Sequence, residues 1–339
     1  MRYFLGADAG GTRTRFLICD EHGQVVGFHE AGPGNHQMIG FDGLHDVLHA
    51  CLREVLGQAG FSAEQVQGAG FSIAGYDWSC EYQPIMDVLA TLGLRAPFKL
   101  VNDAIPGLVA GTREGWGLAI VSGTGCNCRG WDRAHQREGR VTGYGIVMGE
   151  AAGGSELVFR AMQLVGYAWS GRLPATALTQ AFISVAGARD AEDLLEGYTK
   201  ERYHIGASEA PLVFRVAEEG DPVARDLIRW AGCQLGEMAS GVIHQLGFEN
   251  ERFEVVLSGS MFDGGPLLIE PMQETILRVA PGASFVRLSV PPVIGSVLIG
   301  MEQAGLQVDA GIRARLAETL RAFTNNGQPV NQVAGRLGQ

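Results

Sequence analysis

The sequence predicts an α/β protein built from two related domains. Strands in a hairpin meander are followed by alternating helices and strands, and the same order then recurs in the second half of the 339-residue chain. An apolar strand runs into a glycine turn in three roughly equally spaced regions, 8–15, 118–125 and 255–265. One such turn is weak evidence because glycine turns are common. Three of them indicate an internally duplicated nucleotide site.

The first glycine turn lies between strands expected at 3–8 and 14–19. It reads Asp8-Ala9-Gly10-Gly11-Thr12-Arg13-Thr14-Arg15. Gly10 and Gly11 allow a tight turn and a close approach of the backbone to a ligand. The hydroxyls of Thr12 and Thr14 would face that ligand, and Asp8 is placed to hold a cation. The octet therefore predicts a phosphate and Mg²⁺ cradle, although an ordinary hairpin with an Asp turn explains it equally well.

The next elements of the first half are a strand, a loop and a helix. The strand is expected at 24–29 and the helix at 41–59, where apolar residues recur at helical spacing. Asn35 lies in the loop between them and can both donate and accept hydrogen bonds, as a sugar hydroxyl or amide requires. A plain loop asparagine is the alternative.

Asp103 is the candidate general base. A strand at 67–74 and a helix at 82–93 precede a further strand at 98–101, which ends in Asn102-Asp103-Ala104 before a small-residue helix at 105–112. An acid at the carboxyl end of a strand is where α/β folds place their chemistry. Asp103 would take a proton from an attacking hydroxyl while the γ-phosphoryl group leaves ADP. A helix N-cap is the alternative, and for an isolated Asp it is the commoner role.

The second half opens with a strand at 118–121 and a turn of Ser122, Gly123, Thr124 and Gly125. Residues 126–131 could continue as a strand. A glycine-studded loop begins at Gly143 and Tyr144 and ends at Glu150, whose carboxylate could accept bonds from sugar hydroxyls. The helix that follows, to about residue 166, could bind an anion at its first amides.

The remaining elements complete the second half. Residues 157–245 are mostly helical by period, and they are followed by expected strands at 255–258 and 285–290 and by helices at 267–279, 292–303 and 310–322. The predicted domains are 1–117, then 118–304 with a helical insertion. Residues 305–339 are expected to be a closing helix, which could pack back on the first domain, and a loose tail.

Composition excludes several classes of function. A net charge of −11 argues against a nucleic-acid partner. No apolar run reaches the ~18 residues of a membrane span, and the N-terminus leads directly into a strand, so a cytoplasmic protein with no membrane partner is expected. Only two lysines occur and no Gly-Lys-Ser/Thr sequence is present, which excludes a Walker A loop. Cys126 and Cys128 would share one face of an extended segment, so a metal or cluster ligand pair is the alternative to simple packing.

Taken together, these motifs resemble the N-acetylglucosamine kinase branch of the BadF/BadG/BcrA/BcrD ATPase family, within the actin-like, sugar-kinase and Hsp70 ATPase fold. The resemblance covers nearly the whole chain in order. It rests on Asp8-x-Gly-Gly-Thr-x-Thr, Asn35-His36, Asn102-Asp103-Ala104, Ser122-Gly-Thr-Gly-x-Asn-Cys, Gly143-Tyr-Gly and Ser258-Gly-Ser. It implies two ribonuclease-H-like domains flanking a nucleotide and sugar cleft. It also implies ATP and Mg²⁺ as cofactors and phosphoryl transfer to a sugar 6-hydroxyl.

The resemblance implies a role for each matching residue. Asp8 would organise Mg²⁺, and Gly259 and Ser260 would lie near adenosine. The phosphate-binding residues would be Gly10, Gly11, Thr12, Arg13, Thr14, Ser122, Gly123, Thr124 and Gly125. The sugar-binding residues would be Asn35, Asp103, Gly143, Tyr144 and Glu150, with Asp103 as base. A homodimer is compatible with the family, although no feature of the sequence demonstrates one.

One departure from the family pattern leaves the sugar open. The family reads Gly-Asp-Glu-Gly-Ser where this chain has Gly149-Glu150-Ala151-Ala152-Gly153. The longer acid extends the carboxylate by about 1.5 Å, one C–C bond. The substrate could therefore be N-acetylglucosamine, glucosamine or a related hexose derivative. Two alternatives of another class are an ATPase that activates a reductase through an iron–sulfur cluster and a non-catalytic sugar sensor.

Overall fold

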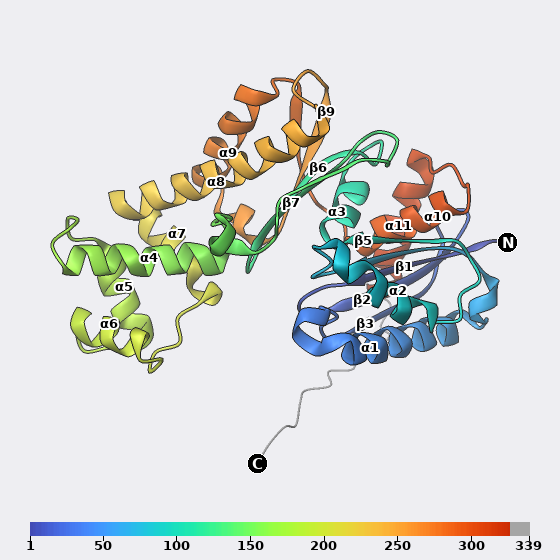
Figure 1. The fold of residues 1–339 in the computed structure, drawn as a ribbon, viewed down its shortest axis with the longest axis horizontal. Helices are drawn as coiled ribbons and strands as arrows, with labels where there is room; N and C mark the ends of the chain where they lie inside the picture. Colours follow the sequence, from blue (N-terminus) through green and yellow to red (C-terminus); the bar gives the residue numbers. More distant parts are fainter. Residues whose placement is uncertain (326–339) are drawn as a thin grey trace, which may run out of the picture. The chain divides into compact units, whose positions relative to one another are not determined.

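The computed structural model describes residues 1–325, and the chain forms two compact units (Figure 1). Unit 1 comprises Met1–Gly115 and the C-terminal segment that begins at Ser289, and unit 2 comprises Trp116–Leu288. The sequence-based boundary after residue 304 differs from this division, because residues 289–304 lie in unit 1. The tail expected beyond Thr324 falls almost entirely outside the described residues.

Unit 1 contains a five-stranded mixed sheet in the order β3-β2-β1-β4-β5. β1 pairs antiparallel with β2 and parallel with β4, and β4 pairs parallel with β5. The strands are β1 (Tyr3–Ala9), β2 (Thr14–Asp20), β3 (Val25–Ala31), β4 (Val66–Ile73) and β5 (Phe98–Asn102). The carboxyl ends of the three mutually parallel strands therefore meet at one edge of the sheet.

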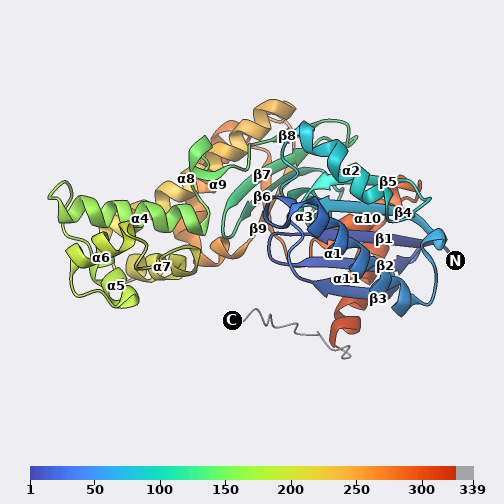
Figure 2. The ribbon, with the colours of Figure 1, turned by 60° about the horizontal axis from the view of Figure 1, so that its bottom comes forward.

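Helices cover both faces of this sheet. The helices of unit 1 are α1 (His36–Ala59), α2 (Tyr82–Ala90), α3 (Ala104–Gly111), α10 (Val293–Gln303) and α11 (Ala310–Asn325), with short 3₁₀ turns η1 (Ala63–Gln65) and η2 (Ser79–Glu81). α1 and α2 bury their apolar sides on one face, and Figure 2 shows α1 lying along β2 and β3. α10 packs on the other face, where glycines leave room for its backbone. A methyl group added to Gly70 would lie 2.1 Å from the Ser296 carbonyl oxygen.

Unit 2 contains a second five-stranded sheet in the order β10-β9-β6-β7-β8. The strands are β6 (Gly117–Ser122), β7 (Cys126–Trp131), β8 (Glu138–Arg140), β9 (Phe253–Ser258) and β10 (Ala283–Arg287). β6 pairs antiparallel with β7 and parallel with β9, as β1 does with β2 and β4. The two sheets therefore share one topology, which confirms the prediction of two related α/β domains.

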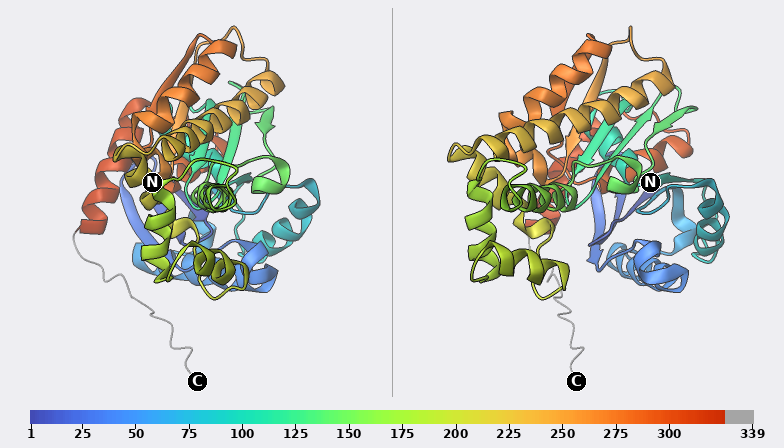
Figure 3. Two further views of the ribbon diagram at one scale, coloured as in Figure 1. Left: turned by 90° about the vertical axis from the view of Figure 1, so that its left-hand side faces the viewer. Right: turned by 60° about the vertical axis from the view of Figure 1, so that its left-hand side comes forward.

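The helices of unit 2 include an insertion between β8 and β9. They are α4 (Gly154–Trp169), α5 (Ala177–Ala186), α6 (Ala191–Thr199), α7 (Ala210–Glu218), α8 (Pro222–Leu246) and α9 (Pro266–Val279), with 3₁₀ turns η3 (Gly145–Met148), η4 (Ala207–Glu209) and η5 (Ser260–Gly264). Gly232 and Gly236 bring α8 against α9, and Figure 3 shows these two helices, gold and orange, side by side. One continuous apolar core joins the sheet to the insertion.

Most expected elements are present, with two informative differences. α1 begins at His36 rather than 41, because Asn35 caps it and Gly40 (φ 71°) introduces a kink after its first turn. The expected continuation at 126–131 is β7, whereas the three-residue β8 was missed. Among residues 1–325, no helix combines the length and apolar character that crossing a membrane demands.

We predict that Gly70→Ala destabilises unit 1 by about 1–3 kcal/mol, because its new methyl group would collide with the α10 backbone. Urea unfolding measures this change. Gly57→Ala is the matched control, since a methyl group there would meet no atom within 4 Å and the exposed site lies inside α1. The control should raise stability by about 0.5–1 kcal/mol. Equal stability of the two variants would contradict the close packing of α10 on β4.

Candidate functional site

The first glycine turn projects from the carboxyl end of β1. Asp8, one residue before the end of β1, accepts a hydrogen bond from the Ser72 hydroxyl of β4 at 3.0 Å. The Gly10 amide donates to the Arg13 carbonyl at 2.8 Å, which closes the turn, and the Gly34 amide donates to the Gly10 carbonyl at 2.9 Å. The turn is therefore held from both sides while Thr12 and Arg13 stay exposed.

Asp8 is a buried acid in a mostly apolar setting. Burial raises the pKa of Asp8 from 3.8 to about 6, although the bond from Ser72 and the positive charge of Arg15 lower it. The hydroxyl of Thr14 is also buried nearby and has no hydrogen-bond partner among the described residues. A carboxylate and a spare hydroxyl oxygen are hard ligands of the kind that Mg²⁺ prefers, and Mg²⁺ commonly takes only one or two carboxylates besides substrate phosphates. The residues present fit a cation that arrives with a nucleotide.

Asn35 occupies the N-cap of α1. Its side-chain oxygen accepts the Gln37 amide at 2.8 Å. The same oxygen lies against Gly75, the glycine that follows β4, where an added methyl group would come within 2.6 Å of it. Gly75 has φ 82°, so both its conformation and this contact require glycine. The plain-loop interpretation of Asn35 is thus replaced by a fixed cap.

Asp103 occupies the N-cap position of α3, but its side chain makes no capping bond. The N-terminal bond of α3 comes instead from Asn102, whose side-chain oxygen accepts the Ala104 amide at 3.0 Å, whereas the Asp103 side chain makes no capping bond. The Asn102 amide group also donates to the Tyr76 carbonyl and to Asp77, both at 3.1 Å. Asn102 therefore supplies the side-chain capping bond of α3, and Asp103 does not.

The strand register places Asp8 and Asp103 at one edge of the sheet of unit 1. Asp8 lies opposite Ser72, and Ser72 lies opposite Val101. Neighbouring strands are ~4.8 Å apart, so Asp8 and Val101 are separated by about 10 Å across the sheet. Asp103 follows two residues later. Unit 1 thus brings the predicted metal ligand, the predicted base and the Asn35 cap to the same end of the fold.

The second glycine turn, in unit 2, joins β6 to β7. The Gly123 amide bonds the Gly125 carbonyl at 2.9 Å, and the amides of Gly154 and Ser155 bond the carbonyls of Gly123 and Thr124 at 2.7 and 2.9 Å. A methyl group on Gly153 would lie 2.4 Å from the Gly125 backbone. The first residues of α4 are therefore fixed against this turn. Their amides donate to the turn carbonyls, so the expected binding of an anion by the first amides of α4 is not supported at Gly154 and Ser155.

Glu150 is buried and bonded within its own loop. Its carboxylate accepts the amide and the hydroxyl of Thr142 at 2.5 and 2.7 Å and the Gly145 amide at 3.3 Å. Gly143, Gly145 and the exposed Tyr144 belong to the segment that these bonds close. Glu150 thus shapes the loop that was predicted to bind sugar, and its role as a direct sugar ligand stays a prediction.

The third glycine turn follows β9 and contacts the second. Gly259 has φ 105°, and a methyl group on it would lie 2.1 Å from the Ser122 carbonyl oxygen. Arg287, the last residue of β10, donates to the carbonyls of Leu257 and Gly259 at 2.9 and 2.8 Å and to Asp263 at 2.9 Å. Arg287 therefore holds the turn in place from the adjacent strand.

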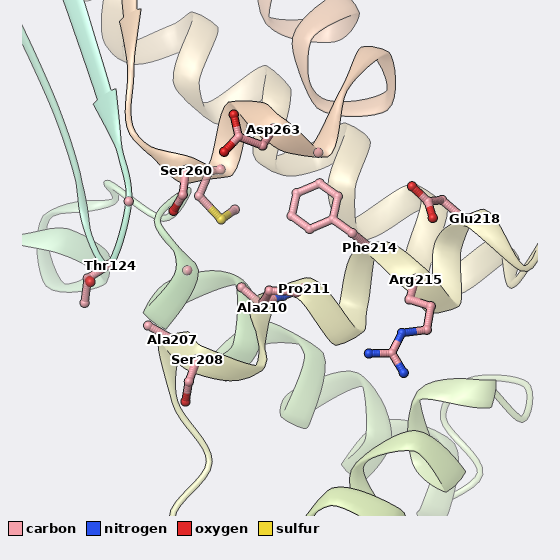
Figure 4. Close-up of a pocket in the computed structure, with 14 residues that line it drawn as sticks. Thr124, Ala207, Ser208, Ala210, Pro211, Phe214, Arg215, Glu218, Ser260 and Asp263 are labelled. Atoms are coloured by element: carbon pink, nitrogen blue, oxygen red, sulfur yellow. The ribbon is translucent and has the colours of Figure 1, made fainter. Parts of the chain in front are cut away.

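A pocket of about 800 Å³ opens beside these two turns (Figure 4). Thr124 and Ser260 come from the turns, and Phe214 and Arg215 come from α7. The Phe214 ring packs on Gly264, where an added methyl group would be 2.1 Å from it. This volume is in the range of small-molecule sites. Of the two residues predicted to lie near adenosine, Ser260 lines the pocket, and the binding of adenosine there stays a prediction. The sequence analysis did not predict that Phe214 and Arg215 line a pocket, because the helical spacing of apolar residues does not show which helix borders a pocket.

Cys126 and Cys128 lie on β7 with their thiols in the apolar core of unit 2. Burial raises the pKa of Cys126 to about 12 and raises that of Cys128 further. Both thiols are therefore protonated at neutral pH, whereas metals bind the thiolate. Within residues 1–325, no three His, Cys, Asp or Glu side chains are grouped as a metal cage. These facts favour packing as the role of the pair.

The fold is similar to that of solved proteins described as sugar kinases. In structure, the chain resembles a candidate N-acetylglucosamine kinase of Chromobacterium violaceum with a TM-score of 0.64 and 24% identity, over 88% of this chain and 99% of the other. The model of the BadF/BadG/BcrA/BcrD ATPase family matches residues 5–300. The chain belongs to this family of ATPases, so its nucleotide is ATP.

Two relatives in sequence match over most of their length. An N-acetyl-D-glucosamine kinase from Dictyostelium discoideum is 25% identical over 312 residues, which cover 88% of this chain and 97% of the relative. An N-acetylmuramic acid/N-acetylglucosamine kinase from Clostridium acetobutylicum is 24% identical over 308 residues, covering 89% and 99%. The match therefore extends across both units.

We predict that Asp8→Asn stabilises the metal-free protein at pH 8. Between pH 3.8 and about 6 the unfolded Asp8 ionises while the folded one keeps its proton, so the free energy of unfolding of the wild type falls as pH rises through this window. The variant has no carboxyl group at this position and does not lose stability in this way. Its free energy of unfolding should exceed that of the wild type by on the order of 1–3 kcal/mol above pH 6 and should equal it near pH 4. Urea unfolding with a chelator present measures the difference.

Asp42→Asn, at an exposed site on α1, is the control for the loss of one negative charge. A variant Asp8→Asn that is no more stable than the wild type at pH 8 would contradict the proposed burial of the Asp8 charge.

Proposed function

We propose that this protein transfers the γ-phosphoryl group of ATP to the 6-hydroxyl of an amino sugar, with N-acetylglucosamine as the substrate to test first. The observation that carries the proposal is the position of Asp103, which directly follows β5 at the same end of the unit 1 sheet as Asp8. Two relatives that match over nearly their whole length are named amino-sugar kinases, which supports the substrate class.

The sugar hydroxyl, Asp103 and Asp8 each have one role in the proposed reaction. The sugar oxygen attacks the γ-phosphorus, the bond between that phosphorus and the oxygen bridging it to the β-phosphorus breaks, and ADP leaves. The proton of the hydroxyl passes to the Asp103 carboxylate as the new bond forms. Asp8 would hold Mg²⁺, which supplies charge neutralisation on the phosphate oxygens when bound.

The backbone amides of the glycine turns would hold the phosphates. Turns of this kind direct successive N–H groups at an anion. The pocket beside Ser260 and Phe214 would take adenosine. We assign Gly143 and Tyr144 to the sugar, with Glu150 shaping their loop. Glucosamine or another hexose derivative is the alternative acceptor, because Glu150 departs from the family pattern.

We predict that Asp103→Asn lowers sugar-dependent ADP release by about 10²-fold or more, the scale of a lost general base, while ATP and sugar affinity stay near the wild-type values. A coupled ADP assay gives turnover, and calorimetric titration gives the affinities. Asp42→Asn serves again as the control at an exposed site. Near-normal turnover of Asp103→Asn would remove Asp103 from the mechanism.

A further inference from the structure

Glu81, at the junction of η2 and α2, joins two segments of unit 1 through its carboxylate. One oxygen accepts the amides of Asp77 and Trp78, both at 2.7 Å. The other accepts the Gln37 side-chain amide at 3.3 Å and lies 3.4 Å from the His36 ring nitrogen Nε2. Its side chain is only 14% exposed, although the bonds from Gln37 and Trp78 lie at the surface.

The first segment that Glu81 holds is the start of α1. His36 and Gln37 directly follow Asn35, and the Gln37 side chain also donates to the Gly75 carbonyl at 3.2 Å. His36 is buried and stacks on Phe41 with ring centroids 5.0 Å apart. The side-chain oxygen of Asn35 thus sits between the Gln37 amide and Gly75, and the Glu81 carboxylate anchors Gln37 itself.

The second segment is the loop that follows β4. The Tyr76 carbonyl and the Asp77 carboxylate accept the Asn102 side-chain amide, and Asn102 in turn caps α3 beside Asp103. A continuous set of hydrogen bonds therefore runs from Asn35 through Glu81 and the loop at 75–78 to Asn102. Its two ends are the predicted sugar ligand and the neighbour of the predicted base.

The charge of Glu81 suits this position. Partial burial raises the pKa of Glu81, but the bonds from Trp78, Asp77 and Gln37 and the nearby His36 outweigh that effect and hold the pKa below its usual value. The carboxylate therefore stays ionised at neutral pH, with three hydrogen-bond donors and the His36 ring around it. An ionised acceptor makes each of these bonds stronger than a neutral one would.

We propose that Glu81 is a positioning residue for the sugar, which fixes Asn35 and the loop at 75–78 in one arrangement beside Asp103. This inference rests on the proposed sugar kinase activity. It assigns to Glu81 no contact with the substrate. A side chain of this kind acts on the affinity for sugar, because both segments that it joins lead to predicted sugar-facing residues, while the first glycine turn is held by other bonds.

The test compares Glu81→Ala and Glu81→Gln with the wild type in the ADP assay, with the KM for N-acetylglucosamine and the KM for ATP measured separately. Glu81→Ala removes all four interactions and should raise the sugar KM by about 10-fold to 100-fold, the scale of lost bonds to a charged group, with the ATP KM within about twofold. Glu81→Gln keeps the shape but places an NH₂ group among donors, so it should raise the sugar KM by an intermediate factor.

Asp87→Asn is the matched control. Asp87 lies on the exposed side of α2, where it accepts a bond from Gln83 at 2.7 Å, and the change removes the same charge as Glu81→Gln. Its KM values should equal those of the wild type. Hydrogen exchange at the amides of Asp77 and Trp78 gives a second readout, and both should exchange faster in the Glu81 variants.

Three results would overturn the proposal. They are an unchanged sugar KM in folded Glu81→Gln, equal increases in the KM for sugar and for ATP, and protection of the two amides as in the wild type. An active wild type with any of these results rejects the role of Glu81 alone. A wild type with no sugar-stimulated ADP release rejects the sugar kinase function, and the role of Glu81 is rejected with it.

Discussion

In each unit, one residue at the end of the fifth strand holds the turn after the fourth strand, and the candidate site depends on this arrangement. In unit 1, Asn102 bonds Tyr76 and Asp77 beyond Gly75. In unit 2, Arg287 bonds Gly259 and Asp263. Both glycines have positive φ and pack against a neighbouring group, so the turns have a single conformation. The polar groups at each sheet edge are thereby placed before any ligand binds, which is the preorganisation that phosphoryl transfer requires.

The repeated topology explains why two kinds of glycine turn occur. The turns at 10–11 and 123–125 join the first and second strands of their sheets, and the turns at 75 and 259 follow the fourth strands. A turn of the first kind is the one that we propose to hold phosphate. A turn of the second kind in unit 1 supports Asn35, and in unit 2 it packs on Ser122 and borders the pocket with Phe214. One supersecondary design thus serves different chemical tasks in the two units.

Much of this was predictable from local patterns. Apolar runs that end in glycine and hydroxyl residues correctly predicted the turns at 10–11, 123–125 and 259, and Asp103 follows a strand as expected. The roles of these residues in binding and catalysis stay predictions. The pairing of Gly75 with Gly259 was missed, because it depends on which strand each glycine follows in the sheet. The placement of 289–304 with unit 1 was missed, since chain order does not reveal which sheet a helix covers. The orientation of Glu150 depends on Thr142 and Gly145, and spacing alone does not give such bonds.

The most direct test of the account is to identify the product. The protein is incubated with Mg²⁺-ATP and, separately, N-acetylglucosamine, glucosamine, glucose and N-acetylmuramic acid, and phosphorus and carbon NMR then locate any new phosphate ester. The account predicts a phosphate ester on carbon 6 of an amino sugar, formed in equal amount with ADP. Release of ADP and inorganic phosphate at one slow rate with every sugar, and no sugar phosphate, would contradict it.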